Sequence, residues 1–456
     1  MWLDDQVMRL AARGCRIMRQ LRLHIVVPMA LLGAGSVAVL ASGPPPASGT
    51  VVLRAARMFD GTSERLREDA VIVVRGGKIV SVGGNPEIPA GADIVDLGDA
   101  TLLPGFIDAH AHLTLEPDSD YYRKAYNELM RTQSEQAFYA AVNARKTLEG
   151  GFTTVRHVGA RYFIDVGLRN AIDAGLTPGP HMLTAGNAIT ARGGSCDQAP
   201  FPPERVPPKT VVDGVCSGPG ECREAVRSQI KWGASVIKLC VSGGVLSHDP
   251  VDVPQLTAEE MKAAIEEAHN WGRKVAAHAH GDTAARMAVE AGVDSIEHGS
   301  FLSEETLSLM KKKGVFLVPT ITALDWVSSN AGNYPPNIAE KARVAGAASG
   351  AMFRSALRLG VPIALGTDIT VRPNDHGKNA MEFVLMVRHG MRPAAALLAG
   401  TREAARLLGL ERDIGTLETG KTADIVAVAG NPIADIGATG HPVLVMQAGR
   451  LVTKRP

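Results

Sequence analysis

The sequence predicts an α/β protein, and two features of its patterning support this. Over the middle of the chain, short apolar segments alternate with longer amphipathic segments that are rich in Ala, Glu and Lys. Both ends of the chain instead carry β-branched, apolar segments separated by glycine turns. The alternation predicts a parallel sheet with helices packed on it. The two similar ends predict one small β domain to which both termini contribute.

Eight segments in the middle of the chain have the length and composition of buried strands. They are 105–112, 153–158, 181–186, 236–242, 275–280, 295–299, 316–320 and 363–368. The segments 257–271 and 303–313 between them are predicted helices, and a capping box begins at Thr257. Strands and helices that alternate in this way predict a (β/α)₈ TIM barrel. A doubly wound sheet would need a glycine-rich phosphate turn after its first strand, and the sequence has none there.

A small β-sandwich domain is predicted from residues 48–104 and 417–456, on either side of a barrel domain over 105–416. Both terminal parts contain β-branched segments that flank turns. These segments are 71–74, 78–82, 424–428 and 442–452. The first two flank Arg75-Gly76-Gly77, which suits a tight hairpin because glycine accepts the positive φ that such turns require.

Residues 1–41 are predicted to be a signal peptide. A basic stretch precedes an apolar run over 25–41, and Val39 and Ala41 occupy the small-residue positions of a cleavage site. An uncleaved membrane anchor is the alternative, although the run contains Pro28 and is short for a membrane span. The sequence therefore predicts a periplasmic or secreted protein, with no stable membrane insertion if the signal is cleaved.

The charge and composition exclude some classes of partner. The 456 residues carry a formal net charge of +1, and the sequence contains no long basic run. Nucleic acid and acidic membrane surfaces are therefore not expected as main partners. Apolar residues make up 45% of the chain, which is enough for a large buried core.

Four cysteines follow the predicted signal peptide. Cys216 and Cys222 stand on either side of the turn-prone segment 217–220, so a disulfide between them is predicted for an oxidising compartment. Two unpaired thiols are the alternative. Cys196 and Cys240 have no evident local partner.

Residue types that bind metals stand at the ends of several predicted strands, where barrels of this type hold their active sites. They are His110, His112, His278, His280, His298 and Asp368. Residues i and i+2 of a strand point to the same side, so His110 and His112 both face the interior. Lys238 lies within an otherwise apolar strand, where a buried cation needs a partner or a chemical role. One such motif is common by chance, but the series predicts a metal site.

These segments resemble the amidohydrolase superfamily, and the resemblance covers almost all of the chain after the predicted signal peptide. The similar segments are 104–112, 151–156, 237–238, 242–245, 277–281, 295–299, 366–368, 415–417 and 424–426. The branch that the sequence resembles is the prolidase-like and carboxypeptidase-like one, with Xaa-Pro dipeptidases and ochratoxin-hydrolysing amidases. The resemblance implies a hydrolase that cleaves the amide bond of Xaa-Pro dipeptides or N-acyl amino acids.

The resemblance also implies two divalent metal ions, commonly Zn²⁺. The first would be held by His110, His112 and Asp368 and the second by His278 and His298. Lys238 would bridge them as an N6-carboxylysine, since a neutral lysine and carbon dioxide give an anionic carbamate. The metals would lower the pKa of a bound water, so that it supplies a hydroxide, and would polarise the scissile carbonyl. Asp368 is the predicted catalytic residue, which would carry the proton to the leaving nitrogen.

Three further residues are predicted to bind the substrate: His280, His376 and Arg192. His280 shares a face with His278, so it could instead be the metal ligand. Arg192 and His376 follow predicted strands three and eight, where a cation or donor could meet a substrate carboxylate. For any single loop residue, an ordinary solvated role is the alternative.

Two positions depart from the family pattern, and both bear on substrate preference. His157 stands where relatives usually have Asp, and Leu256 stands where related dipeptidases often have an aromatic residue. Alternative functions on the same scaffold are a mononuclear cyclic-amide hydrolase, similar to imidazolonepropionase, and a lactone or ester hydrolase. A non-catalytic barrel is not favoured, because the full set of ligand types is present. Relatives often form homo-oligomers, and we expect one here.

Overall fold

The computed structural model describes residues 49–83, 86–118, 120–197, 204, 206–370 and 375–455. The predicted signal peptide, 1–41, lies outside these residues. Among the helices of the described ranges, none combines the length and the apolar character that crossing a membrane requires.

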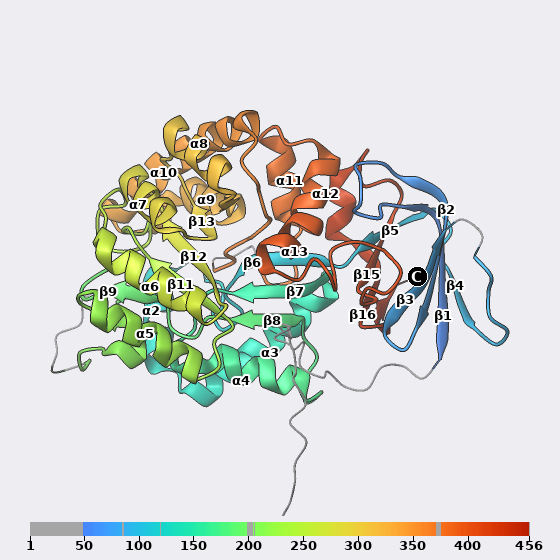
Figure 1. Ribbon diagram of the computed structural model, residues 1–456, viewed down its shortest axis with the longest axis horizontal. Helices are drawn as coiled ribbons and strands as arrows, with labels where there is room; N and C mark the ends of the chain where they lie inside the picture. Colours follow the sequence, from blue (N-terminus) through green and yellow to red (C-terminus); the bar gives the residue numbers. More distant parts are fainter. Residues whose placement is uncertain are drawn as a thin grey trace, which may run out of the picture. The chain divides into compact units, whose positions relative to one another are not determined.

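Strands from the two ends of the chain form one eight-stranded sheet. Its order is β17-β16-β15-β5-β1-β2-β3, with β4 paired to β1. The strands are β1 (Thr50–Met58), β2 (Arg67–Arg75), β3 (Lys78–Gly83), β4 (Asp93–Asp96), β5 (Ala100–Pro104), β15 (Ile425–Ala429), β16 (Pro442–Gln447) and β17 (Arg450–Lys454). The antiparallel pair β5–β15 joins the two ends of the chain, which Figure 1 shows as blue and red strands side by side. The stacking of two sheets as a sandwich stays a prediction.

The predicted hairpin is present as β2 and β3, which pair in antiparallel fashion. Its turn residues Gly76 and Gly77 have φ values of 58° and 77°, which glycine adopts without strain. One face of the sheet buries Leu53 and Ile72 from the first part of the chain together with Ile425 from the last part. Both termini therefore contribute to one apolar core.

The middle of the chain forms two parallel sheets, β6-β7-β8 and β10-β9-β11-β12-β13-β14. Their strands are β6 (Phe106–Ala111), β7 (Phe152–His157), β8 (His181–Thr184), β9 (Ile189–Ala191), β10 (Val215–Cys216), β11 (Val236–Cys240), β12 (Lys274–Ala279), β13 (Ser295–His298) and β14 (Phe316–Val318). The first seven predicted strands correspond to β6, β7, β8 and β11 to β14. The short strands β9 and β10 were not predicted.

The eighth predicted strand, 363–368, has only an isolated bridge between Ile363 and Leu317 in the described chain. The segment still makes backbone hydrogen bonds on both sides. Ala364 N donates to Leu317 O of β14 at 3.0 Å, and Ala109 N of β6 donates to Leu365 O at 2.8 Å. Two features interrupt a regular ladder. Asp368 has a left-handed φ of 50°, and an added Cβ at Gly366 would lie 2.7 Å from the His110 Cβ.

The helices connect and cover these strands. They are α2 (Tyr121–Met130), α3 (Gln133–Glu149), α4 (Ile164–Asp173), α5 (Pro219–Lys231), α6 (Ala258–Asn270), α7 (Asp282–Ala291), α8 (Glu304–Lys313), α9 (Ile321–Ser329), α10 (Pro336–Leu359), α11 (Met381–Arg388), α12 (Pro393–Ala399) and α13 (Arg402–Leu408). The two helices predicted from the sequence are α6 and α8, and the capping box of Thr257 and Glu260 is formed at the start of α6. Helices α5 to α8 pack against one another in sequence order, as Figure 1 shows.

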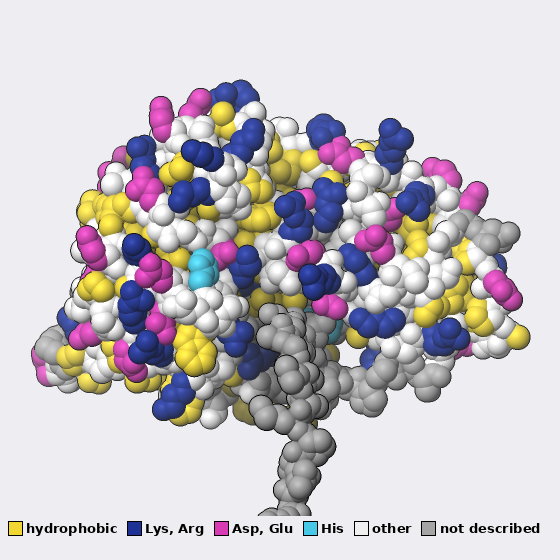
Figure 2. Space-filling view, viewed as in Figure 1, with side chains coloured by type: hydrophobic (Ala, Val, Ile, Leu, Met, Phe, Trp, Pro, Cys, Tyr) yellow, Lys and Arg dark blue, Asp and Glu magenta, His cyan; other side chains and the backbone are white. Residues whose placement is uncertain are grey.

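The surface in Figure 2 mixes basic and acidic side chains over the visible face. Some exposed charges are paired between neighbouring helices. Arg223 of α5, for example, donates to Glu266 of α6 at 3.1 Å. Such exposed pairs contribute little stability singly, so the fold depends on its apolar cores.

The described part of the chain contains two disulfides. Cys216 and Cys222 are joined across a sequence separation of 6 residues, which is the expected pair. Cys196 and Cys240 are joined across 44 residues, a pair that the sequence did not predict. The second pair forms because β9 lies beside β11, with Cys240 paired to Thr190. It ties the loop after β9 to the strand that carries Lys238.

The two disulfides should differ in their contribution to stability, because a longer loop loses more chain entropy when it is closed. We expect the double variant Cys196→Ser/Cys240→Ser to lose about 4 kcal/mol of unfolding free energy. The matched variant Cys216→Ser/Cys222→Ser should lose about 2 kcal/mol. Urea unfolding of the metal-free proteins measures both values. Equal losses would show that loop entropy does not govern the difference.

Candidate metal centre

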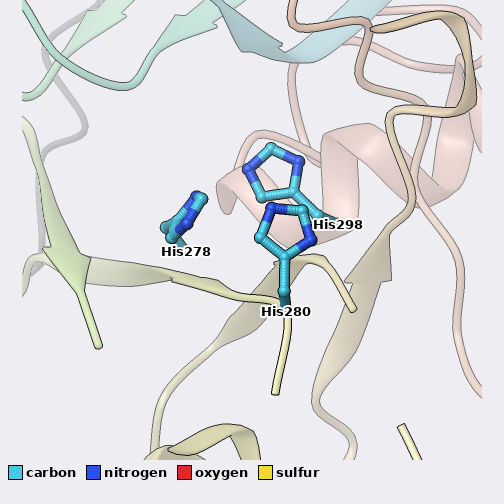
Figure 3. Close-up of side chains that lie close together, drawn as sticks. All are labelled: His278, His280 and His298. Atoms are coloured by element: carbon cyan, nitrogen blue, oxygen red, sulfur yellow. The ribbon is translucent and has the colours of Figure 1, made fainter. Parts of the chain in front are cut away.

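Three histidines converge at the ends of β12 and β13. His278 lies near the end of β12, His280 directly follows that strand, and His298 ends β13. One ring nitrogen of each lies within 4.8 Å of the others. The strands pair in parallel with Ala279 opposite His298, which brings the three side chains to one edge of the sheet. Figure 3 shows the rings of His278, His280 and His298 facing a shared space. The arrangement can offer several nitrogen ligands to one cation.

A second group of ligand atoms shares His298 with the first. His110 of β6, His298 and Asp368 also place one ligand atom each within 4.8 Å of one another. His112 lies beside this group, because its Nε2 is 3.5 Å from Asp368 Oδ1. The structure therefore brings together the five histidines and the aspartate that the sequence singled out at the strand ends.

Two of these residues have unusual backbone conformations. His298 has a φ of 70° and Asp368 a φ of 50°, both in the left-handed region that non-glycine residues rarely adopt. The backbone of Asp368 is held by another strand, since Asp368 N donates to His110 O at 2.8 Å. Strain of this kind is concentrated at functional sites, where it aims a side chain that a regular strand end would not.

Hydrogen bonds fix which nitrogen of His110 and His112 is free. His110 Nδ1 lies 2.7 Å from Glu297 Oε2, and His112 Nδ1 lies 3.2 Å from the carbonyl of Gly159. A carboxylate and a carbonyl can only accept, so both Nδ1 atoms carry the proton. Both Nε2 atoms then present a lone pair toward Asp368. This is the orientation by outer partners that metal-binding histidines typically have.

The other histidines are oriented in a similar way. Thr320 Oγ1 donates to the Pro319 carbonyl at 2.8 Å, so it accepts the proton of His298 Nδ1 at 2.7 Å. His278 Nε2 donates to the Gly243 carbonyl at 3.3 Å, which leaves its Nδ1 free. His280 Nδ1 lies 2.8 Å from the Ser300 hydroxyl, which can donate or accept. The tautomer of His280 therefore stays open, as does its role.

Burial keeps these histidines neutral. Desolvation, aided by the charge of Lys238, lowers the pKa of His112 and of His280 to about 3. Burial also lowers the pKa of His110, His278 and His298 well below the usual value. Neutral imidazoles are the form that coordinates a metal.

Lys238 and Asp368 are two buried ionisable groups of this cluster that interact electrostatically. Lys238 lies in β11 opposite Ala276 of β12, and its side chain is buried. Burial lowers the pKa of Lys238, while the carboxylates of Glu297 and Asp368 oppose this effect. Burial likewise raises the pKa of Asp368. Burial thus favours the neutral form of each side chain relative to the same group in water.

Glu297 is a buried residue beneath the site that sequence reasoning did not single out. Its carboxylate accepts hydrogen bonds from Arg156 Nη2 at 2.8 Å and Ser295 Oγ at 2.5 Å, and also from His110. Arg156 is fully buried and also donates to the Ala109 carbonyl at 2.5 Å. The signal in the sequence was an acid and a base inside apolar strands, the same signal that marked Lys238.

Asp108 is a second buried acid that the sequence did not single out. It accepts hydrogen bonds from Thr367 Oγ1 at 2.6 Å and Asn379 Nδ2 at 2.8 Å. It also accepts from the backbone of His110 at 3.0 Å and of Thr367 at 3.1 Å. Asp108 thus couples the segment that carries Asp368 to the strand that carries His110 and His112.

The residues predicted to bind the substrate occupy different places. His376 is buried, and its Nε2 donates to the Leu115 carbonyl at 2.9 Å. Its charge when protonated would act on His112, so it lies near the cluster. Arg192 is exposed and donates to the Lys209 carbonyl at 3.3 Å. None of its contacts within the described ranges reaches the histidines, so its role stays a prediction.

The two departures from the family pattern are both buried. His157 Nε2 accepts a hydrogen bond from Thr114 N at 3.3 Å, and its Nδ1 lies 3.8 Å from Asp165 Oδ2. His157 therefore supports the turn just after His112, and its ring meets that of His112 edge-on. Leu256 packs in the main apolar core and offers no polar group.

Comparisons with known proteins agree with this geometry. Residues 101–452 match the family described as "Amidohydrolase family". Ochratoxinase from Aspergillus niger is 31% identical over 419 residues, which cover 86% of this chain and 84% of that protein.

Solved structures are similar over nearly the whole described chain. A Xaa-Pro dipeptidase with bound methionine in its active site has a TM-score of 0.84 and 37% identity, covering 88% of this chain and 99% of the other. A prolidase complexed with N-methylphosphonate-L-proline has a TM-score of 0.79 and 28% identity, covering 89% and 100% of the two chains.

Glu297→Gln should weaken metal binding, because the amide no longer accepts the His110 proton as a carboxylate does. We expect zinc affinity to fall about 10- to 100-fold and the unfolding free energy to fall by about 2 to 3 kcal/mol. Competition with a chelator and urea unfolding measure these quantities.

The matched control is Glu304→Gln, which changes a Glu–Arg pair whose two side chains are both exposed. It should keep zinc affinity and change the stability little, because an exposed ion pair is screened by solvent. A similar loss of zinc affinity in both variants would contradict the role given to Glu297.

His376 should make the metal-free protein less stable in acid. Burial lowers its pKa to about 4, whereas a histidine in the unfolded chain titrates near 6.5. Between these values the unfolded chain binds more protons, so the unfolding free energy falls as the pH falls from 6.5 to about 4. His376→Gln keeps a donor for Leu115 and should remove about 3 kcal/mol of this decline. Urea unfolding across the pH range, with chelator present, measures it, and parallel curves for the two proteins would refute it.

Proposed function

Because the chain belongs to the amidohydrolase family and is a hydrolase that acts on amide bonds, we propose that its substrates are Xaa-Pro dipeptides or N-acyl amino acids. The observation that carries the proposal is the pair of ligand groups that share His298, with Lys238 buried among them. The relatives add support, since they include a Xaa-Pro dipeptidase and an ochratoxinase.

The side chains fit two divalent metal ions, with Zn²⁺ as the first candidate. His110, His112 and Asp368 would hold one ion, and His278 and His298 would hold the other. The fit rests on the neutral, oriented imidazoles, whose outer nitrogens bond to Glu297, Gly159, Thr320 and Gly243. When bound, such ions lower the pKa of water and polarise the carbonyl to be cleaved.

Lys238 would bridge the two positions as an N6-carboxylysine. Its buried amine reacts with carbon dioxide to give a carbamate and a proton, which replaces a cation by an anion. A cation at this place would oppose metal binding. Burial is the main cause that lowers the pKa of His110 and His298, and the charge of Lys238 lowers it further. The carbamate removes that conflict between Lys238 and the site.

Asp368 is the proposed proton carrier. Its Oδ1 lies 3.5 Å from His112 Nε2 and 3.8 Å from His110 Nε2, at the centre of one ligand group. Burial raises the pKa of this carboxyl. It can therefore accept a proton from the attacking water and release it to the nitrogen of the leaving amino acid.

His280 and His376 are proposed to contact the substrate. His280 stacks on His298, with ring centroids 4.9 Å apart, and so lies as close to the site as a ligand would. If His280 proves to be the ligand, then His278 takes the place beside the substrate. Arg192 is also proposed to contact the substrate, but its side chain would first have to leave the Lys209 carbonyl to which it donates.

We also propose that the two parallel sheets and the segment 363–368 close into one (β/α)₈ barrel over 105–416, with the terminal β domain as a sandwich. Support comes from the hydrogen bonds of that segment to β14 and β6. On the other side, Ser235 N just before β11 donates to Thr184 O of β8 at 2.8 Å. Backbone hydrogen bonds would then join neighbouring strands around the whole barrel.

A periplasmic or secreted location is proposed from the disulfides, because such bonds persist in oxidising compartments. Cell fractionation tests it, and recovery of the protein with reduced cysteines from the cytosol would refute it.

A homo-oligomer is proposed from the exposed apolar side chains of α2 and α3, among them Tyr122, Tyr126, Met130 and Phe138. Sedimentation velocity measures the mass, and a monomer at working concentration would refute it.

The first test is the metal content of the protein expressed from Ser42 with bicarbonate present. We expect about two zinc ions per chain and a carboxylated Lys238 by intact mass. Lys238→Ala should lose most of the metal and all amide hydrolysis, while the exposed control Lys231→Ala should keep both. Activity is read on a panel of Xaa-Pro dipeptides and N-acyl amino acids.

The opposite results have clear meanings. One metal ion per chain, unchanged by Lys238→Ala, would overturn the bridged site and direct the search to cyclic amides. Full zinc binding without hydrolysis of any member of the panel would overturn the proposed substrates while leaving the metal centre in place.

A further inference from the structure

We propose that Lys124 binds the free carboxylate at the C-terminal end of the substrate, and so selects acids over amides. This inference rests on the function proposed above, to which it adds the residue that recognises the leaving amino acid. Lys124 lies in α2, the helix that follows β6 and its histidines. Sequence reasoning did not single it out.

The contacts of Lys124 place its ammonium at the rim of the metal centre. Its Nζ donates to the Thr370 carbonyl at 3.2 Å, two residues beyond Asp368. Its charge acts on both Asp368 and His112, which belong to the same ligand group. The side chain is half-buried, so it is neither locked in the core nor free in solvent.

Helix geometry keeps Lys124 on the inner side of α2. Tyr122 and Tyr126 are four residues apart and both well exposed, so they mark the outer face. Lys124 lies halfway between them in sequence, which puts it about half a turn away, on the opposite face. Asp120 caps the helix by accepting from the backbone of Tyr122 and Arg123. The cap and the Thr370 contact together hold the lysine toward the site.

Other cations near the cluster are already engaged. Lys341 donates to the carbonyls of Gly244 at 3.0 Å and Asp249 at 2.8 Å, and also to that of Ser247. Arg156 donates hydrogen bonds to Glu297 and to the Ala109 carbonyl. Lys238 is buried and interacts with the carboxylates of Glu297 and Asp368. Lys124 contacts one carbonyl among the described residues, and an ammonium has three donors to offer.

The chemistry of the substrate matches this position. In a dipeptide or an N-acyl amino acid, the free carboxylate lies about one residue length, roughly 3.8 Å, beyond the scissile amide. A carbonyl held at the metals therefore carries its carboxylate to the rim of the centre. A lysine on a flexible stem can follow carboxylates of differently sized amino acids. A neutral C-terminal amide would gain no charge-assisted hydrogen bond there.

The test compares each panel substrate with its own C-terminal amide, using zinc-loaded protein. N-acetyl amino acids, Xaa-Pro dipeptides and the matching amides would be followed by chromatography of the released amine. Wild type should prefer the acids. Lys124→Met should raise the KM for the acids about 10- to 100-fold and leave kcat nearly unchanged. Its kinetics on the amides should match those of wild type.

Two further variants make the result specific. Lys124→Arg keeps a cation and should recover most of the preference for acids. Arg123→Met removes a neighbouring charge from the same helix, where Arg123 is exposed and paired with Asp118, and should leave both substrate series unchanged. Zinc content and thermal unfolding of each variant exclude a loss of fold as the cause.

Three results would overturn the assignment. Wild type could hydrolyse acids and amides equally well, or Lys124→Met could weaken both series alike, which would mark Lys124 as structural. Arg123→Met could reproduce the effect of Lys124→Met, which would assign it to the general field of α2. If zinc-loaded wild type cleaved neither series, the proposed function itself would fail, and the assignment with it.

Discussion

The buried carboxylate of Glu297 is the constraint on which the rest of the site depends. It accepts from His110 of β6 and from Arg156 of β7, although it lies itself on β13. A charge buried this deeply is stable only when it is paired and fully hydrogen-bonded. Satisfying Glu297 therefore fixes the mutual positions of these strand ends. The same bond sets the His110 tautomer, so one interaction serves both the packing of the strands and the chemistry of the ligand.

Other residues of the centre are also oriented by hydrogen bonds to neighbouring elements. Asp108 links the backbones of His110 and Thr367, and Thr320 and Gly243 fix the rings of His298 and His278. Each ligand is thus oriented by a neighbouring element and not by its own rotamer preference alone. The left-handed backbones of His298 and Asp368 fit this arrangement, because hydrogen bonds from outside must offset their strain. A site built in this way is preorganised before any ion binds.

Part of the site could be predicted from the sequence, because strand periodicity decides which residues two positions apart share a face. His110 with His112 and His278 with His280 follow that rule. Glu297 and Asp108 could not be assigned a role in advance, since their partners come from strands distant in the chain. The pair Cys196–Cys240 depended on the unpredicted strand β9 beside β11. The irregular segment 363–368 likewise reflects the close approach of Gly366 to His110, which no local pattern records.

The residues proposed for catalysis and the residue proposed for substrate selection lie on different kinds of elements. The groups proposed to act on the amide bond stand on strand ends that are buried and cross-linked by Glu297 and Asp108. Lys124, in contrast, stands on α2, a helix with no fully buried residue, which contacts the rest of the protein through Tyr121 and through the bond from Lys124 to Thr370. Changes in α2 can therefore alter which substrate end is accepted without disturbing the ligand set. Because loops and helices after the strands vary more readily than the strands themselves, specificity in this chain should be sought in α2 before it is sought in the metal centre.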